Sequence, residues 1–357
     1  MFDKHADVVR QRAEHIVSEH SELTGELRWR SARDRSGPRG VRVVVTGSPG
    51  ALTAAVAEHL GAHPEVASLR RLDLAEPRSA QRLRDVDAVV HVALTLDCSA
   101  DPAAVPDAAR ILRAAPAVPR FVLVSSAMVY GADPGNDLPL DEDAPLRAAD
   151  DSGLVASLME VERLVEAARP VGRTVLRPAM LVGRGADTIF ARHFSAPRLL
   201  QVQGSRPAWQ FCHVDDLLDA IGYAVTGRVS GVVTVGCEGW LEQETVEVIA
   251  GMRRLALPAA LAFGAAERLH RLGVSPAPAS ELRYVAHPWV VSSARLLAAG
   301  WRPTHDNAAA LGELLADLRA AGGRRGLREA PLSAAGAAVA MVGTAALLRQ
   351  ARRRRRA

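Results

Sequence analysis

Short apolar runs alternate with helical stretches along the chain from Val41 to about Val182. Strands this short and apolar, separated by helices, are typical of a parallel sheet that helices cover on both faces. We therefore predict an α/β fold with a doubly wound parallel sheet. The predicted strands are Val41–Val45, Val66–Leu72, Ala88–Val92, Phe121–Ser125 and Thr174–Leu176, and the predicted helices are Ala51–Leu60, Ala104–Ala114 and Leu154–Ala168.

The same pattern divides the chain into four regions. Residues 1–40 look like an N-terminal extension and linker, because Arg30–Gly40 is rich in Arg, Ser, Gly and Pro. Residues 41–180 hold the alternating pattern. It weakens in residues 181–323, where Pro, Gly and Trp are frequent, so we expect a smaller, irregular substrate region interleaved with the first. Residues 324–357 form a separate tail.

The tail combines an apolar segment with a cluster of arginines. Leu332–Leu348 carries no charge, and Arg349 and the five arginines at 352–356 follow it. A spanning helix needs roughly 20 apolar residues, so this segment is at the bottom of the range. The arginines favour an anionic cytoplasmic membrane surface. We expect a cytoplasmic protein, and three alternatives stay open for the tail: it spans a membrane, lies on its surface or does not touch it.

Composition narrows the chemistry of the site. The net charge is +4, but nine arginines and one acid from Arg324 onward give +8, so the rest of the chain carries about −4. Basic and aromatic residues do not cluster in the body, which argues against nucleic acid as a partner. Cys98, Cys212 and Cys237 lack the spacing of a metal site and fit a reducing cytoplasm. Lys4 is the only lysine, so no mechanism can use a lysine unless the extension folds back into the site.

The segment Val43–Thr53 predicts a site for a dinucleotide pyrophosphate. An apolar, β-branched run ends at a glycine turn, and a helix follows. Gly47 permits the tight turn, Gly50 lets the backbone approach a phosphate, and the helix N-terminus offers unpaired N–H groups and a positive dipole. Thr53 stands where the third glycine of the fingerprint is expected, so the motif alone is only moderately specific.

Four further segments follow the glycine turn in order. Asp87–Ala93 ends a strand in His-x-Ala, and Phe121–Gly131 ends a strand in two serines followed by Val-Tyr-Gly. Val175–Pro178 ends in Arg-Pro, and Phe211–Asp216 precedes an apolar helix. With the glycine turn, they closely resemble the extended short-chain dehydrogenases, the NAD-dependent epimerase/dehydratase family, over about residues 41–318. The whole pattern, including the Glu-Val-Glu sequence at 160–162 and Arg-Gly-Ala-Asp at 184–187, resembles an atypical actinobacterial branch of that family.

The resemblance implies a Rossmann-like domain that holds NAD or NADP and a C-terminal region that receives a nucleotide sugar or a related small substrate. Ser126 matches the serine that hydrogen-bonds a reacting carbonyl or hydroxyl, and it is the candidate catalytic residue. No metal is expected. The matching cofactor-binding positions are Gly47, Ser48, Gly50 and Thr53 in the pyrophosphate loop, Asp73 and Leu74 at the adenine, and Val92 and Ala93 at the nicotinamide-side ribose.

The catalytic pair of the family is missing. Its base is a tyrosine with a lysine four residues later, because the lysine charge lowers the pKa of the tyrosine and holds the ribose. Aligning Glu162 with the family's later acid places Leu154 at the tyrosine and Leu158 at the lysine. A shift of one or two residues does not restore the pair, because the segment has no tyrosine and the body has no lysine.

Two functions therefore stay open. The first is an NAD(P)-dependent epimerase, dehydratase or reductase with a non-standard site, in which Glu160, His91 or Tyr130 would act as the base. The second is a non-catalytic dinucleotide sensor or membrane-proximal scaffold. Each candidate also has a structural interpretation: Ser125 and Ser126 could cap a strand end, His91 could be a core histidine, and His213 with Asp215 and Asp216 could fix the C-terminal region and cap its helix.

The segment after the second predicted strand leaves the choice of cofactor open. Only about 35 residues separate Thr53 from Asp87, so a strand and its connection are shortened or lost. The acid that binds the adenine ribose, expected about 20 residues after the glycines, could be Asp73. Arg70 and Arg71 could equally accept the 2′-phosphate of NADP. The oligomeric state also stays open.

Overall fold

The computed structural model describes residues 40–74, 83, 85–96, 101–115, 118–148, 153–184, 186, 188–272 and 279–324. The chain divides into two units, Met1–Arg39 and Gly40–Ala357, and all the described residues belong to the second. The extension up to residue 39, Cys98 and the apolar and arginine segments of the tail lie outside the described residues, so expectations about them stay predictions. Among the described helices, none is long and apolar enough to cross a membrane.

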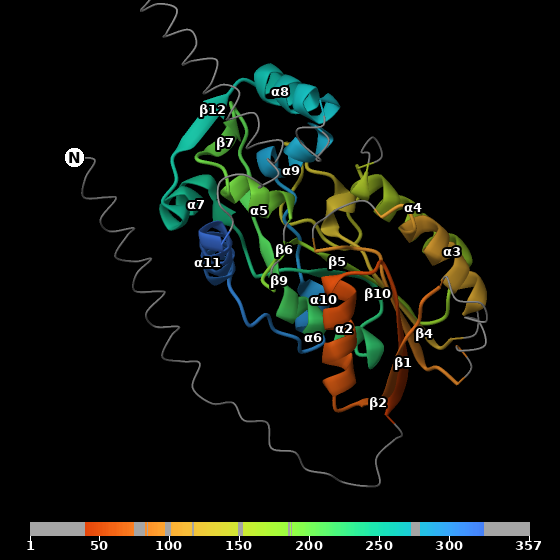
Figure 1. Ribbon diagram of the computed structural model, residues 1–357. Helices are drawn as coiled ribbons and strands as arrows, with labels where there is room; N and C mark the ends of the chain where they lie inside the picture. Colours follow the sequence, from red (N-terminus) through yellow and green to blue (C-terminus); the bar gives the residue numbers. More distant parts are fainter. Residues whose placement is uncertain are drawn as a thin grey trace, which may run out of the picture. The chain divides into compact units, whose positions relative to one another are not determined.

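A six-stranded parallel sheet forms the centre of this unit (Figure 1). All neighbouring strands pair in parallel, as the sequence pattern predicts. Five strands lie within two residues of their predicted bounds, whereas β10, an apolar Gly-Val-Val-Thr-Val run, is not among the predicted strands. In spatial order the strands are β2 (Val66–Arg71), β1 (Val41–Gly47), β3 (Ala88–Val92), β4 (Arg120–Val124), β5 (Arg173–Pro178) and β10 (Gly231–Val235).

Burial along the strands explains the apolar runs. Every residue of the central strand β3 is buried, whereas the edge strand β2 has no buried residue. A central strand of a parallel sheet needs apolar side chains on both faces, because helices cover both. Helices α2 (Ala51–Ala62) and α6 (Val214–Val225) lie together on one face, and α3 (Ala104–Ala114) and α4 (Leu154–Ala168) lie together on the other (Figure 1).

The strand order reverses between β1 and β3. The chain passes from β1 to β2 on one side and returns to β3 on the other side of β1. Ligands of open α/β sheets bind beyond the carboxyl ends of the strands at such a switch point. Within the described residues β2 is the outermost strand at this edge of the sheet. Residues 75–82 lie outside the described residues, so the shortened connection between Thr53 and Asp87 stays a prediction.

The C-terminal region is built from three two-stranded sheets and short helices. Strand β10 returns from it to the main sheet beside β5, and one hydrophobic core runs through both regions, so the two are interleaved. The paired strands are β6 (Met180–Val182) with β9 (Phe211–His213), β7 (Leu199–Val202) with β12 (Arg254–Leu257), and β8 (Ala208–Trp209) with β11 (Leu241–Glu242). The other elements of this region are α5 (Ile189–Phe194), α7 (Gln243–Ala250), α8 (Ala259–Arg271), α9 (Arg283–Ala286), α10 (Ala294–Ala298), α11 (Asn307–Arg324) and the 3₁₀ turn η3 (Ala279–Leu282). A second 3₁₀ turn, η2 (Ala127–Tyr130), follows β4 of the main sheet.

Candidate functional site

The turn after β1 requires a glycine at its first position. Gly47 has a φ angle of +128°, and a Cβ atom there would lie 2.1 Å from the carbonyl oxygen of Val92 on β3. The two backbones come this close because the N–H of Ser48 donates a 3.0 Å hydrogen bond to the same oxygen. Glycine alone tolerates both the backbone angle and the approach. It therefore lets β1 turn into α2 directly at the switch point.

The helix N-terminus behind Gly50 is open. Gly50 immediately precedes α2, and a Cβ atom added to it would meet no atom within 4 Å. The N–H groups of the first helical turn have no acceptor within the helix and carry the positive end of its dipole. The Ser48 Oγ atom is buried and has no hydrogen-bond partner among the described residues, so it can bind an incoming group. These features fit the pyrophosphate of a dinucleotide.

Thr53 occupies the third glycine position of the fingerprint and supports the loop. Its side chain is buried, and its Oγ1 atom donates a 2.6 Å hydrogen bond to the carbonyl oxygen of Ser48. A glycine at this place would only permit close packing of helix and strand. The threonine hydroxyl also ties the first turn of α2 to the glycine turn.

The other predicted cofactor positions lie at the ends of the neighbouring strands. Val92 ends β3, and the next residue, Ala93, donates a 3.0 Å backbone hydrogen bond to Val124 of β4. Both are buried. Asp73 is exposed and Leu74 is buried just beyond β2. The structure thus brings all of these residues to the carboxyl edge of the sheet.

Ser126 lies just past β4, where it caps the 3₁₀ turn η2. Its Oγ atom accepts a 3.2 Å hydrogen bond from the N–H of Met128, and its side chain is buried. Ser126 thus acts as a cap, which is the structural interpretation that the sequence analysis sets beside a catalytic role. A hydroxyl that accepts one bond can still donate its own proton, so Ser126 can also bind a substrate oxygen.

Leu154 and Leu158, which the sequence alignment predicts to stand in place of the family's tyrosine and lysine, lie on α4. Both are buried, and their spacing of four residues puts them on one face of the helix. Neither side chain can accept or donate a proton. This face of α4 serves as apolar packing.

One turn further along α4, Glu162 forms a buried ion pair with Arg177 of β5. Its Oε2 atom lies 2.6 Å from Nη2 of the arginine, and its Oε1 atom lies 3.2 Å from Nε. The Ser125 hydroxyl donates a 2.6 Å hydrogen bond to the same carboxylate, and the guanidinium lies 4.7 Å from the ring centroid of Tyr130. The sequence interpretation uses Glu162 only to align α4 and does not predict this network. The signal in the sequence that points to this network is a glutamate on the predicted helix and an arginine at the end of a predicted apolar strand.

None of the three candidate bases has a pKa near neutral, as efficient proton transfer there requires, and two of them are also buried. Glu160 is on the outer side of α4, and its hydrogen bonds with Arg163 lower its pKa. His91 is wholly buried in β3, and burial lowers its pKa to about 4. Tyr130 is also wholly buried; burial raises its pKa, and its hydroxyl donates a 3.3 Å hydrogen bond to the carbonyl oxygen of Glu142.

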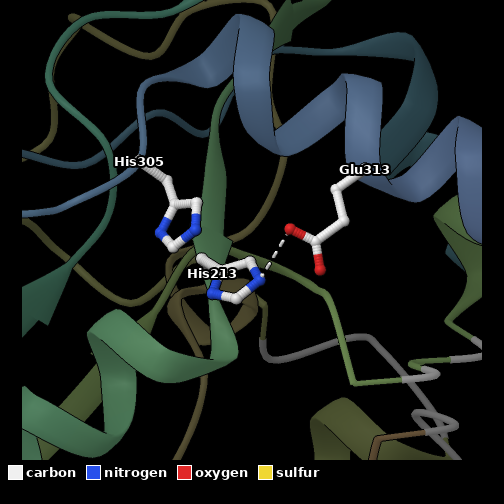
Figure 2. A group of neighbouring side chains, drawn as sticks. All are labelled: His213, His305 and Glu313. Carbon is white, nitrogen blue, oxygen red and sulfur yellow. Dashed lines mark ion pairs between the residues drawn. The ribbon is translucent and has the colours of Figure 1, made fainter. Parts of the chain in front are cut away.

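A second polar cluster joins α6 to α11 (Figure 2). His213 ends β9 and caps α6, because its Nδ1 atom accepts a 3.2 Å hydrogen bond from the N–H of Asp215. Its Nε2 atom lies 3.1 Å from a carboxylate oxygen of Glu313 on α11. The ring of His305 stacks on the ring of His213 with the centroids 3.7 Å apart. This agrees with the interpretation of His213 as a residue that caps a helix and fixes the C-terminal region.

Electrostatics strengthen this connection. Burial alone would raise the pKa of Asp216, but hydrogen bonds from His305 and Thr304 outweigh it and hold the pKa below its usual range. The same contact raises the pKa of His305. A carboxylate and an imidazolium therefore favour each other's charged form between α6 and the segment that leads into α11.

The cluster also has the donor atoms of a metal site. His213, His305 and Glu313 each place one ligand atom within 4.8 Å of the others, and two imidazoles with a carboxylate suit a transition metal ion. The planes of the stacked rings differ by only 24°, so the nitrogen lone pairs lie in nearly parallel planes and do not converge on one point. The N–H of Asp215 also occupies the Nδ1 lone pair of His213. The geometry is that of a connection through ring stacking and a close contact between an imidazole and a carboxylate.

Two buried histidines should make the protein sensitive to acid. Within the part of the chain that the structure describes, the ring nitrogens of His91 and His193 have no hydrogen-bond partner, and burial lowers the pKa of each to about 4. The unfolded chain takes up these protons near pH 6.5, whereas the folded chain takes them up only near pH 4. The free energy of unfolding should therefore be largest above pH 6.5 and should fall by roughly 3 kcal/mol for each histidine as the pH drops to 4. Urea unfolding at several pH values between 7 and 4.5 measures the loss.

A single substitution checks the origin of this acid sensitivity. The ring of His193 stacks on Trp209 with the centroids 5.3 Å apart, and a phenylalanine can keep that contact. We expect His193→Phe to depend less steeply on pH than the natural chain. An equal dependence in both proteins would contradict the assignment.

Comparisons with known proteins agree with this site. A model of the NAD dependent epimerase/dehydratase family matches residues 39–236. An uncharacterised protein of Mycobacterium bovis is 30% identical over 187 residues, which are 48% of this chain and 50% of that protein. The chain thus spans about half the length of the curated relatives it matches.

Solved structures show the same fold. UDP-glucuronic acid 4-epimerase of Bacillus cereus, in complex with NAD, gives a TM-score of 0.56 at 15% identity over 78% of this chain and 99% of that one. The protein RMD of Pseudomonas aeruginosa, complexed with NADPH, gives a TM-score of 0.54 at 22% identity, over 78% of this chain and 99% of that one.

The family match covers more than half of the chain and includes the glycine turn and all four segments that follow it. The family is described as NAD dependent, which agrees with the cofactor class, NAD or NADP, that the sequence predicts. The chain therefore belongs to the NAD-dependent epimerase/dehydratase family.

Proposed function

We propose that this protein binds NAD or NADP across the carboxyl ends of β1 and β3. The observation that carries this proposal is the open helix N-terminus behind Gly50, placed at the switch point of the sheet. The unpaired hydroxyl of Ser48 beside it offers the phosphate an additional donor. The remaining contacts would come from Gly47 at the pyrophosphate, Thr53 in support of the loop, Asp73 and Leu74 at the adenine, and Val92 and Ala93 at the nicotinamide-side ribose.

Thermal unfolding with and without cofactor tests the proposal. A dinucleotide at a hundred times its Kd should raise Tm by roughly 5 °C. Gly50→Asp should fold normally, because a Cβ atom there meets no atom within 4 Å, but its carboxylate would occupy the phosphate site and repel the phosphate. We expect this variant to lose the shift. Gly264→Asp is the matched control, since a Cβ atom there also meets nothing, and it should keep the shift. No shift in the natural chain with any oxidised or reduced dinucleotide would contradict the proposal.

The proposed substrate is a nucleotide sugar or a related small molecule bound by the C-terminal region. Ser126 would hydrogen-bond its reacting oxygen, because the serine lies beyond β4 at the same edge of the sheet as the glycine turn and its proton is free to be donated. The chemistry would be non-standard, because Leu154 and Leu158 stand in place of the tyrosine and lysine of the family.

A second candidate function is a dinucleotide-binding sensor or scaffold without catalysis. The buried leucine face of α4 favours it, together with the burial or ion pairing of Glu160, His91 and Tyr130. Nicotinamide absorbance across a panel of nucleotide sugars separates the two functions. Catalysis predicts a spectral change that is lost in Ser126→Ala and kept in Ser126→Thr. Bound cofactor without any spectral change would support the sensor.

A further inference from the structure

Two arginines end β2 beside the glycine turn. Arg70 and Arg71 are the last residues of this strand and pair in register with Val44 and Val45 of β1. Since Gly47 ends β1, the arginines stand at the carboxyl edge, where folds of this kind bind the adenosine ribose. An acidic residue at this place would accept a hydrogen bond from the ribose 2′-hydroxyl of NAD. Here both final positions of the strand are basic.

Neither arginine is engaged within the part of the chain that the structure describes. Arg70 and Arg71 are both exposed, and among the described residues no hydrogen bond or ion pair holds either guanidinium. Arg42 and Arg177, two other arginines of the same sheet, pair with carboxylates. Two adjacent guanidinium groups without acids leave a local excess of positive charge, which attracts an anion.

The nearest candidate acid is displaced from the strand end. Asp73 lies two residues beyond β2. Asp107 has a pKa raised mainly by burial, and the carboxylate of Asp73 adds to the rise, so Asp73 lies near the first turn of α3. Asp73, whose carboxylate would repel a phosphate on the ribose, therefore lies beyond the end of the strand and not on it.

We propose that Arg70 and Arg71 bind the 2′-phosphate of NADP(H) and that the protein prefers NADP(H) to NAD(H). This inference rests on the proposed dinucleotide site and names the cofactor that the site takes. Guanidinium groups bind phosphate oxygens through paired, charge-assisted hydrogen bonds. Successive strand residues point to opposite faces, so the two long side chains can approach a phosphate beyond the strand end from both sides.

Isothermal titration calorimetry of the full chain with NADP⁺ and NAD⁺ tests the inference. NADP⁺ should bind at least about tenfold more tightly, and the fragments 2′,5′-ADP and 5′-ADP should differ in the same direction. The preference should weaken as salt is added, because the arginines are exposed. The double variant Arg70→Ser, Arg71→Ser should lose the preference and keep its affinity for NAD⁺. Arg268→Ser, which removes an exposed arginine from α8, should retain the preference.

The outcomes separate this inference from the proposed function. NAD⁺ binding as tight as NADP⁺ binding in the natural chain would overturn the inference and leave the proposed function in place. A preference that survives in the double variant would overturn the role of the two arginines. Binding of neither dinucleotide would overturn the proposed function, and this inference with it.

Discussion

Replacing Gly47 with alanine should lower the free energy of unfolding by at least about 4 kcal/mol. The new Cβ atom would lie 2.1 Å from the carbonyl oxygen of Val92 and 2.7 Å from its carbonyl carbon and amide nitrogen. The φ angle of +128° is itself unfavourable for alanine. Relief requires β1 and β3 to separate in the centre of the sheet, which breaks the hydrogen bond from Ser48 to Val92. Urea unfolding followed by circular dichroism measures the change.

Gly50→Ala is the matched control for this substitution. Gly50 lies three residues away in the same turn, its φ angle of 166° is extended, and a Cβ atom there meets nothing within 4 Å. We expect its stability to stay within about 1 kcal/mol of the natural chain. Soluble Gly50→Ala protein alongside insoluble Gly47→Ala protein would agree with the prediction. Equal stability of the two variants would contradict it.

Replacing Glu162 with glutamine should cost about 3–5 kcal/mol of stability. The side chains of Glu162 and Arg177 are only 8% and 6% exposed, and their closest atoms lie 2.6 Å apart. Glutamine keeps the shape but removes the charge, so the guanidinium stays buried without a counter-ion. The hydrogen bond from Ser125 would also lose its charged acceptor. Chemical unfolding of the variant at neutral pH measures the loss.

A double-mutant cycle identifies the ion pair as the cause. The double variant Glu162→Leu, Arg177→Met removes both charges together. Its loss in free energy of unfolding should be smaller than the summed losses of the two single variants by about 2 kcal/mol or more. Glu267→Gln is the surface control, because Glu267 and Arg271 form an exposed pair at 3.0 Å on α8. It should change stability by less than about 1 kcal/mol. Additive effects at positions 162 and 177 would contradict the assignment.

The elements of the main sheet could be predicted because local sequence controls them. β3, α3 and α4 have the predicted bounds, since a continuous apolar run and helical spacing specify each within a few residues. Strand β10 is not predicted, although Gly231–Val235 is apolar. It lies in a region of irregular pattern, and only its pairing with β5, from much earlier in the chain, makes it a strand of the main sheet.

The two polar clusters could not be predicted for a related reason. Glu162 and Arg177 come from a helix and a strand, and they meet because α4 packs on the face of the sheet to which Arg177 points. His213 and Glu313 are a hundred positions apart and meet only because α11 lies against β9. Contacts of this kind depend on sheet register and helix packing, which no local pattern encodes.

By itself, the sequence determined the glycine turn, the order of the motifs and the absence of lysine from residues 5–357, because each depends only on which residues stand at which positions. The tertiary structure alone decided the surroundings of the candidate site residues. It buries Leu154 and Leu158 in the core, encloses His91 and Tyr130, and leaves Arg70 and Arg71 without partners among the described residues. The physical reason is that the reactivity of a side chain depends on its solvent exposure and on nearby charges, and folding brings those together from distant parts of the chain.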